Sequence, residues 1–368
     1  LCDRRQRQMC IRDSPIKEKK MEETTMKHMK PFLFVFLLLL VGCQTKEETP
    51  VEPVSQNKFL LGTIVNITLY DNPKQEIFDE IFNAIEEIET MMTINNATTS
   101  EIIEINRQAG LEAVKVSQNT FDVIKAGLTY SELAKGKFDI TVGPLVKLWE
   151  IGFDDAHVPE ASEIENSLTL INYKNVELNE KDLTIKLTQP HMMIDLGGIA
   201  KGYAADVTAS ILKQHGNKHA IINLGGNVYA YGEKPNQAAW KIGVQNPFST
   251  RGEYLGIASV KDKTVVTSGT YERYFEQDGV IYHHILDPQT GYPVQNNVMS
   301  VTIIADSSMT ADALSTTAFA LGIEQGLNLI ESISGVEALY VTDEKQLYAT
   351  SGFLDYFQLT DDTFTLVQ

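Results

Sequence analysis

The chain has 368 residues, of which 31 are Lys or Arg and 49 are Asp or Glu, so its net charge near pH 7 is −18. The 43% share of hydrophobic residues excludes disorder of the whole chain. The acidic balance argues against a nucleic-acid-binding protein, which needs a basic face to meet phosphates. All three cysteines lie in the first 43 residues, so the rest of the chain can form no disulfide framework and no cysteine-ligated metal site.

An apolar run, Phe32–Val41, follows a short basic stretch near the start of the chain. Ten residues rise about 15 Å as a helix, which is too short for a hydrocarbon core of about 30 Å. The run is therefore typical of a secretory signal peptide. It is followed by Gly42 and Cys43, an ending that resembles a bacterial lipobox, in which the cysteine carries the lipid. The alternative is a signal peptide that ends near a chance cysteine.

These features predict an exported protein that is lipid-anchored to the bacterial cell membrane through Cys43. The polar, Arg-rich start of the chain is unusual for a signal peptide, so we interpret it as a non-native leader. The predicted organisation is a leader at 1–25, a lipoprotein signal peptide at 26–42, a flexible tether at 43–57 and one domain at 58–368.

Helix and strand patterns are interspersed along that domain without a regular βαβ rhythm. Apolar spacing predicts helices at 77–92, 121–134, 199–215 and 310–321. Strand patterns occur at 59–70, at 336–349, and in two hairpins that turn at 179–182 and at Asp278-Gly279. This order favours a single α+β domain with antiparallel sheets and packed helices.

The segment Asp195–Gly202 combines a strand end, two adjacent glycines and a helix start. Glycines let the backbone approach a ligand, and the first turn of a helix offers free N–H groups to a phosphate. Lys201 adds a positive charge in that first turn. The alternative is a tight turn with a lysine that faces solvent.

Asp312 and Thr316 are four residues apart, so they share one face of the helix predicted at 310–321. A carboxylate and a hydroxyl on one face suit Mg²⁺, a hard cation that prefers oxygen ligands. The alternative is an aspartate that complements the helix dipole beneath a capping Thr310.

Two adjacent histidines, His283 and His284, precede a turn that contains Pro and Gly. Neighbouring residues of a strand point to opposite faces, so only one of the two can enter a site, where it can serve as a general base. The alternative is that both belong only to the strand. Glycines also flank short strands at 136–145 and 222–227, where each is more often part of a turn.

Taken together, eight segments in order along the chain resemble the ApbE family, whose members are FAD:protein FMN transferases. They are LGT at 61–63, SE at 100–101, FDITVGPL at 138–145, DLGGIAKGYAAD at 195–206, INLGGN at 222–227, TSGTYERYF at 267–275, HILDPQTGYP at 284–293 and ADALSTTAFALG at 311–322. The resemblance implies an α+β ApbE fold that binds FAD as substrate and Mg²⁺ as cofactor.

The resemblance also implies roles for single residues. Side-chain ligands of the metal would be Asp312 and Thr316, with the carbonyl of Gly198 as a further ligand, and His284 would be the catalytic base. The implied contacts to FAD are Leu61 near the flavin, Phe138, Asp139, Asp195, Lys201 and the backbone of Leu286. One departure is that the stretch at 94–99 has no aromatic residue to stack on the nucleotide.

The expected activity is transfer of FMN from FAD to a Thr or Ser hydroxyl of a target redox protein, with release of AMP. Family targets carry an Asp/Ser-Gly-Ala-Thr/Ser-like segment. One alternative is an FAD pyrophosphatase, in which water replaces the hydroxyl, and the missing aromatic residue favours it. The other is a flavin-binding lipoprotein without catalysis.

Overall fold

The computed structural model describes residues 52–95 and 98–367. The chain divides into two units, residues 1–48 and 49–368, and the described residues all belong to the second. The predicted leader, the signal peptide and Cys43 lie outside the described residues. Within the described ranges, no helix is long and apolar enough to cross a membrane.

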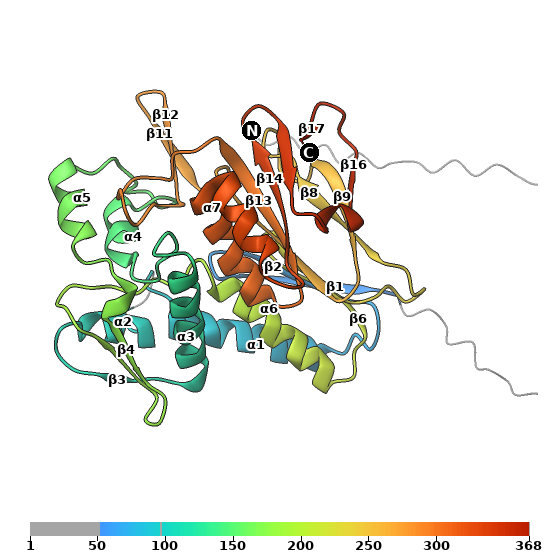
Figure 1. The fold of residues 1–368 in the computed structure, drawn as a ribbon. Coiled ribbons are helices and arrows are strands. Elements are labelled where there is room, and N and C mark those ends of the chain that lie inside the picture. Colours follow the sequence, from blue (N-terminus) through green and yellow to red (C-terminus); the bar gives the residue numbers. More distant parts are fainter. Residues whose placement is uncertain (1–51, 96–97, 368) are drawn as a thin grey trace, which may run out of the picture. The chain divides into compact units, whose positions relative to one another are not determined.

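A nine-stranded sheet forms the centre of the fold (Figure 1). Its strands, in order across the sheet, are β1 (Val54–Leu60), β2 (Thr63–Leu69), β6 (His219–Leu224), β7 (Asn227–Gly232), β10 (Lys263–Gly269), β13 (Val298–Ala305), β14 (Glu337–Thr342), β15 (Gln346–Ala349) and β17 (Thr365–Leu366). All neighbours are antiparallel except β15 and β17. The predicted antiparallel α+β class is confirmed.

Three smaller sheets surround the large one. One contains β16 (Phe357–Leu359), β9 (Tyr254–Val260) and β8 (Trp240–Gln245), and another contains β3 (Val114–Lys115), β5 (Thr184–Leu187) and β4 (Val176–Asn179). The third is a hairpin of β11 (Tyr274–Gln277) and β12 (Val280–His283). Its turn residues, Asp278 and Gly279, both have positive φ, as the predicted hairpin turn requires.

The helices are α1 (Gln75–Met92), α2 (Glu101–Arg107), α3 (Gln118–Leu133), α4 (Gly143–Trp149), α5 (Ala161–Leu168), α6 (Ala200–Gln214) and α7 (Ser308–Glu331), with 3-10 turns η1 (Tyr173–Asn175) and η2 (Phe353–Asp355). Helix α6 packs between α1 and α7, and α7 covers β10 and β13 (Figure 1). Helix α7 extends ten residues beyond the predicted end at 321, with a kink at Gly322, where φ is 76°.

Strand β13 shows how the sheet acquires two cores. Val301 and Ile303 pack against α7, whereas Ile304 points to the opposite face and packs with the β16-β9-β8 sheet. Because successive side chains of a strand alternate between faces, a strand covered on both sides is buried along almost its whole length, here including the polar Ser300 and Thr302. The burial pattern of β13 agrees, since seven of its eight residues are buried.

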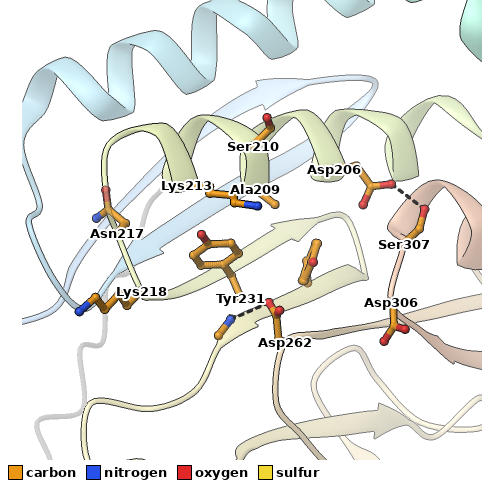
Figure 2. A pocket seen from close by; sticks show the side chains of 12 residues that line it. Asp206, Ala209, Ser210, Lys213, Asn217, Lys218, Tyr231, Asp262, Asp306 and Ser307 are labelled. Carbon is orange, nitrogen blue, oxygen red and sulfur yellow. Dashed lines mark hydrogen bonds between the residues drawn. The ribbon is translucent and has the colours of Figure 1, made fainter. Parts of the chain in front are cut away.

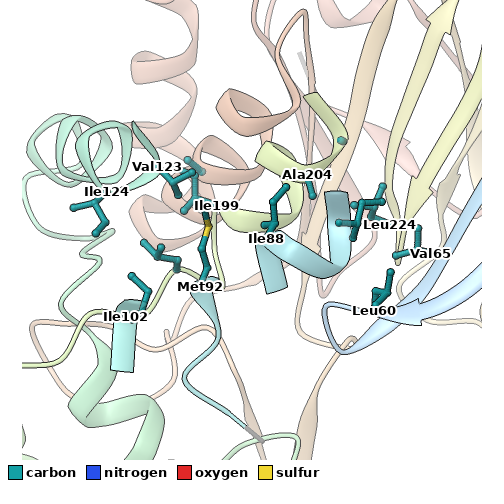
Figure 3. Packing of buried hydrophobic residues seen from close by; sticks show 14 of the residues in the cluster. Leu60, Val65, Ile88, Met92, Ile102, Val123, Ile124, Ile199, Ala204 and Leu224 are labelled. Carbon is teal, nitrogen blue, oxygen red and sulfur yellow. The ribbon is translucent and has the colours of Figure 1, made fainter. Parts of the chain in front are cut away.

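A third core lies where α1 and α6 meet the first strands of the sheet (Figure 3). Ile88 of α1 and Ala204 of α6 lie near Leu60, Val65 and Leu224 of the sheet. Burial of a side chain such as Ile88 stabilises the fold by about 1.5–3 kcal/mol. This packing fixes the start of α6 relative to the sheet, and the start of α6 carries several of the predicted site residues.

Two further boundaries predicted from the sequence are wrong. The strand predicted at 59–70 is a hairpin, because Leu61 and Gly62 have φ of 53° and 67° and form the turn between β1 and β2. The segment Val54–Asn57, predicted as the end of a flexible tether, belongs to β1, where it pairs with Asn66–Leu69 of β2. Its polar composition hid this pairing, because β1 is an edge strand whose side chains are mostly exposed.

Candidate functional site

The first turn of α7 is capped by residues other than those that the sequence suggested. The Ser307 hydroxyl accepts a hydrogen bond from the Thr310 N–H, so Ser307 rather than Thr310 is the N-cap. The Asp206 carboxylate of α6 accepts hydrogen bonds from the N–H groups of Ser308 and Met309, at 2.7 and 3.0 Å. Asp206 therefore provides the negative charge that the start of the helix favours, and Asp312 is not needed for that purpose.

Asp312 is a buried carboxylate at the contact between α6 and α7, with 3% of its surface exposed. One oxygen accepts a hydrogen bond from the Gly202 N–H at 2.9 Å, and the other lies 3.7 Å from Lys201 Nζ. Gly202 allows the two helices to come this close, because a Cβ there would lie 2.2 Å from the Ser308 carbonyl oxygen. The glycine that follows Lys201 is therefore a packing residue.

Thr316 follows Asp312 by about one turn of α7, and Gly198, which the resemblance implies as a further ligand, lies close to Thr316. A Cβ at Gly198 would lie 3.7 Å from Thr316 Oγ1 and 3.0 Å from the Phe138 ring. Thr316 Oγ1 also lies 3.3 Å from Ser268 Oγ of β10. The arrangement joins a buried carboxylate, hydroxyls and a glycine backbone, which is an oxygen donor set suited to Mg²⁺.

Among the described residues, no three His, Cys, Asp or Glu side chains come together as a metal site. A cation at Asp312 would thus rely on one carboxylate, hydroxyl and carbonyl oxygens, and oxygens of a bound ligand. Mg²⁺ is commonly held in this way, by one or two carboxylates together with substrate phosphates. The residues present therefore fit the metal that the resemblance implies.

Asp195 lies at the edge of the same site, where its carboxylate accepts a hydrogen bond from the Gly197 N–H at 2.8 Å. Desolvation raises the pKa of Asp195, while that hydrogen bond and the charges of Lys147, Arg273 and Lys201 lower it. Three cations from separate parts of the chain thus face one carboxylate. The sequence indicated only Lys201; the other two were missed.

The two adjacent histidines have separate surroundings. His283 is buried, its Nε2 lies 3.0 Å from the Val294 carbonyl oxygen, and its ring packs edge-on against Phe319. His284 is half-buried and follows β12; its Nδ1 lies 3.2 Å from the Arg273 carbonyl oxygen. The two histidines thus differ in burial and partners, and the role of His284 in the site stays a prediction.

The hydrogen bond to Arg273 assigns the tautomer of His284. A carbonyl oxygen only accepts, so Nδ1 carries the proton and Nε2 keeps its lone pair. Desolvation, followed by the charges of Arg273, His283 and Lys201, lowers the pKa of His284 to about 3. The ring is therefore neutral at physiological pH and can accept a proton at Nε2.

Asp139 has a structural task in its own loop. One oxygen accepts hydrogen bonds from the N–H and the hydroxyl of Thr141, and the other accepts from the Tyr173 N–H at 3.0 Å. Desolvation raises its pKa, and these hydrogen bonds lower it. Asp139 lines a cavity of about 340 Å³ with Tyr173 and Gln289, and the structure leaves its predicted contact with FAD untested.

The three apolar residues that the resemblance implies as FAD contacts lie in different surroundings. Phe138 packs against Gly198, and Leu286 is buried in the cluster that contains Trp149. Leu61 occupies the turn between β1 and β2, and the next residue, Gly62, lies against the Arg273 guanidinium. Of these three residues, Phe138 contacts the glycine-rich turn directly, and the FAD contacts that the resemblance implies for all three stay predictions.

A cavity of about 610 Å³ lies elsewhere, between α6, β7 and the turn at Asp262 (Figure 2). None of the predicted site residues lines it. Its carboxylates already have partners: Asp206 binds Ser307, Asp262 binds the Gly232 N–H, and Asp306 pairs with Lys263. These contacts stabilise turns and the start of α7, so the cavity is not the candidate site.

Comparisons with known proteins agree with the geometry. A model of the ApbE family matches residues 61–340. An FAD:protein FMN transferase of Klebsiella pneumoniae is 39% identical over 81% of this chain and 92% of its own length, and one of Treponema pallidum is 36% identical over 86% and 92%.

Solved structures give the same result. The ApbE protein of Thermotoga maritima aligns with a TM-score of 0.76 and 35% identity, over 83% of this chain and 99% of its own. The flavin transferase ApbE of Vibrio cholerae aligns with a TM-score of 0.74 and 30% identity, over 83% and 100%. Sequence and fold match along nearly the whole described unit, and the chain belongs to the ApbE family.

Proposed function

We propose that this protein is an FAD:protein FMN transferase, which moves FMN from FAD to a Thr or Ser hydroxyl of a target protein and releases AMP. The observation that carries the proposal is the position of Lys201. Its ammonium lies 3.7 Å from Asp312, and its charge offsets part of the desolvation that raises the pKa of Asp195 and adds to the desolvation that lowers the pKa of His284. The candidate metal ligand, the candidate FAD contact and the candidate base therefore surround one lysine.

In this proposal, Asp312, Thr316 and the Gly198 carbonyl would hold Mg²⁺, which would supply positive charge for the FAD diphosphate. Lys201 adds charge on the same side, and its partly exposed ammonium can move from Asp312 toward a phosphate oxygen. The Gly202 N–H fixes the orientation of the Asp312 carboxylate. A carboxylate with one oxygen already hydrogen-bonded to the backbone needs little rearrangement when it binds a cation.

The chemical step that we propose is an in-line displacement at the FMN phosphorus. His284 Nε2 takes the proton of the acceptor hydroxyl, whose oxygen forms a bond to that phosphorus. The bond from this phosphorus to the bridging diphosphate oxygen breaks, and AMP leaves with the electron pair on that oxygen. The Arg273 carbonyl holds the ring at Nδ1 throughout, so that Nε2 faces the reaction.

An FAD pyrophosphatase is the second candidate, because water can replace the acceptor hydroxyl with the same residues. The observation that favours it is the region before α2, which offers no aromatic ring to the nucleotide. Ile94 points into the main core, and the side chain of Asn95 accepts a hydrogen bond from Lys147 at 2.5 Å. A nucleotide held without stacking is less ordered, which gives water more access. A flavin-binding protein without catalysis is the third candidate.

We further propose that Cys43 is lipidated and that the protein is exported and anchored to the bacterial cell membrane. The apolar run and the cysteine that follows it support this proposal. Expression of the full chain and of Cys43→Ser in a bacterial host, followed by detergent phase partitioning and mass spectrometry, tests it. A diacylglycerol adduct on Cys43 is expected; equal partitioning of both proteins into the aqueous phase contradicts it.

The activity is tested by incubating the soluble domain with FAD, Mg²⁺ and a carrier protein bearing an Asp-Gly-Ala-Thr segment. A Thr→Val carrier is the matched control. We expect covalent flavin fluorescence on the carrier, dependent on Mg²⁺ and on the Thr, and one AMP for each FMN transferred. AMP and free FMN without labelling would establish the pyrophosphatase instead. FAD that stays intact would refute both catalytic candidates.

A further inference from the structure

Arg273 lies in the segment TSGTYERYF at 267–275, but the sequence motifs indicated no role for it. Its backbone carbonyl accepts hydrogen bonds from the His284 N–H and Nδ1, so Arg273 and the candidate base are joined at the foot of the β11–β12 hairpin. Its side chain runs past two glycines from distant loops. A Cβ at Gly62 would lie 3.2 Å from Arg273 Nη2, and one at Gly152 would lie 3.0 Å from Cδ.

Both glycines have positive φ, 67° at Gly62 and 95° at Gly152, so their turns resist substitution on backbone grounds as well. The Arg273 side chain thus occupies space that a side chain at Gly62 or Gly152 would partly fill. The guanidinium is directed to the turn between β1 and β2, next to Leu61, and its charge reaches both Asp195 and His284.

No ion pair joins Arg273 to a carboxylate within the part of the chain that the structure describes. Nearby cations differ: Arg251 lies 4.0 Å from Glu272, and Lys137 lies 2.8 Å from Asp287. In a chain with 49 acidic and 31 basic residues, a guanidinium without a carboxylate partner at the edge of a site is available for an anionic ligand.

We propose that Arg273 binds the phosphate of the FMN half of FAD beside His284, and so positions the phosphorus that the acceptor hydroxyl attacks. This inference rests on the proposed function and adds a residue to its substrate site. A guanidinium presents several N–H donors in a fixed plane, which matches two oxygens of a phosphate. Arginine also stabilises the charge that develops on the oxygens of a transferring phosphoryl group.

The same placement couples substrate binding to the base. In the absence of ligand, the positive charge of Arg273 lowers the pKa of His284. A phosphate bound to the guanidinium compensates that charge, so the pKa of His284 rises when FAD is in place. The base then accepts a proton more readily in the complex than in the free protein, which is the state in which proton transfer is useful.

Ligand affinities of Arg273→Gln, measured by flavin fluorescence and by calorimetry, test the assignment without relying on activity. The ligands are FAD, FMN, AMP and riboflavin, which has the flavin but no phosphate. We expect Arg273→Gln to weaken FAD and FMN by about 10- to 100-fold, the range for hydrogen bonds to charged groups, with AMP and riboflavin unchanged. Arg273→Lys should recover part of the loss, because it keeps the charge without the planar fork.

Arg251→Gln is the matched control, because Arg251 is also an exposed arginine nearby but is paired with Glu272 and does not affect the pKa of His284. It should bind all four ligands as the unsubstituted protein does.

An unchanged affinity of Arg273→Gln for FMN would overturn the inference. Equal weakening of riboflavin and FMN would overturn it too, since the side chain would then shape the flavin pocket rather than bind phosphate. Weakening of AMP alone would place the charge at the other phosphate and contradict the assignment.

The unsubstituted protein separates this inference from the proposed function. If it binds FMN more tightly than riboflavin in an Arg273-dependent manner but labels no acceptor, the phosphate site holds and the transferase proposal fails. If it labels the acceptor and Arg273→Gln does so with the same KM for FAD, the transferase proposal holds and the inference fails.

Discussion

The site has two sides that are built differently. The α6–α7 side is buried and closely packed: Asp312 is almost fully covered, and Gly202 lets the two helices touch. The side formed by His284 and Arg273 stands at the foot of a two-stranded hairpin whose outer residues, such as Tyr274 and Ile281, are half exposed or more. A cation needs fixed oxygen ligands, whereas a base that serves a protein acceptor must be reachable from outside. The difference matches these two requirements.

The largest expected effect comes from removing the carboxylate of the buried side. Asp312→Ala should reduce FMN transfer by about a thousandfold or more, because the loss of the proposed metal ligand would remove several kcal/mol of charge stabilisation. Transfer rates measured against Mg²⁺ concentration provide the test. Asp306→Ala is the control, since Asp306 is exposed and its carboxylate pairs with Lys263. If Asp312→Ala transfers FMN at the same rate as the unsubstituted protein, the assignment of Asp312 to the site is wrong.

The exposed side should respond next. His284→Gln is expected to reduce transfer by about 10²- to 10⁴-fold, the usual contribution of a general base, with little change in FAD affinity. Pre-steady-state labelling of the carrier protein measures the step directly.

His283→Gln separates the two neighbours. His283 is buried and lies 3.0 Å from the Val294 carbonyl oxygen, so this variant should lose about 1 kcal/mol of stability and keep most of its transfer activity. If the two variants lose activity equally, the contrast between a catalytic and a structural histidine is wrong.

The two sides of the site also differ in how well the sequence predicts them. The four-residue spacing of Asp312 and Thr316 marks a helix face directly, and the structure places that face beside Gly198. Such local spacing survives folding because the helix itself imposes it.

Arg273 and Lys147 follow no local pattern. They reach Asp195 only through the packing of α4 and the hairpin around the glycine-rich turn, which no periodicity in the sequence encodes. The same holds for Asp206, which caps α7 from another helix, and for the turn at Leu61-Gly62, which an apolar run conceals.

A smaller effect is expected at the helix contact. Gly202→Ala would place a methyl group 2.2 Å from the Ser308 carbonyl oxygen, so α6 and α7 must separate at a cost of about 1–3 kcal/mol. Because the Gly202 N–H holds Asp312, we also expect Mg²⁺ affinity to fall by about 10-fold or more. Denaturant unfolding and calorimetric Mg²⁺ titration measure the two effects.

Ala209→Gly is the control for Gly202→Ala, because it weakens the same helix by about 1 kcal/mol without a clash at α7. Equal losses of Mg²⁺ affinity in both variants would mean that the effect reflects general destabilisation of α6 rather than the position of Asp312.

The smallest expected effect is on acid stability, and it too distinguishes the two sides. The pKa of His284 is lowered from 6.5 to about 3 in the folded protein. Below pH 6.5 the unfolded chain therefore binds a proton that the folded chain does not bind until about pH 3, so this residue destabilises the fold as the pH falls between those values.

His284→Gln should lose less stability than the unsubstituted protein between pH 7 and pH 5, in urea unfolding curves at each pH. The exposed His157→Gln serves as the reference. The effect stays small because the His284 side chain is only half-buried and water can reach it. Parallel curves for His284→Gln and the unsubstituted protein would show that folding does not lower the pKa of His284, which would contradict the desolvation of the ring in the folded protein.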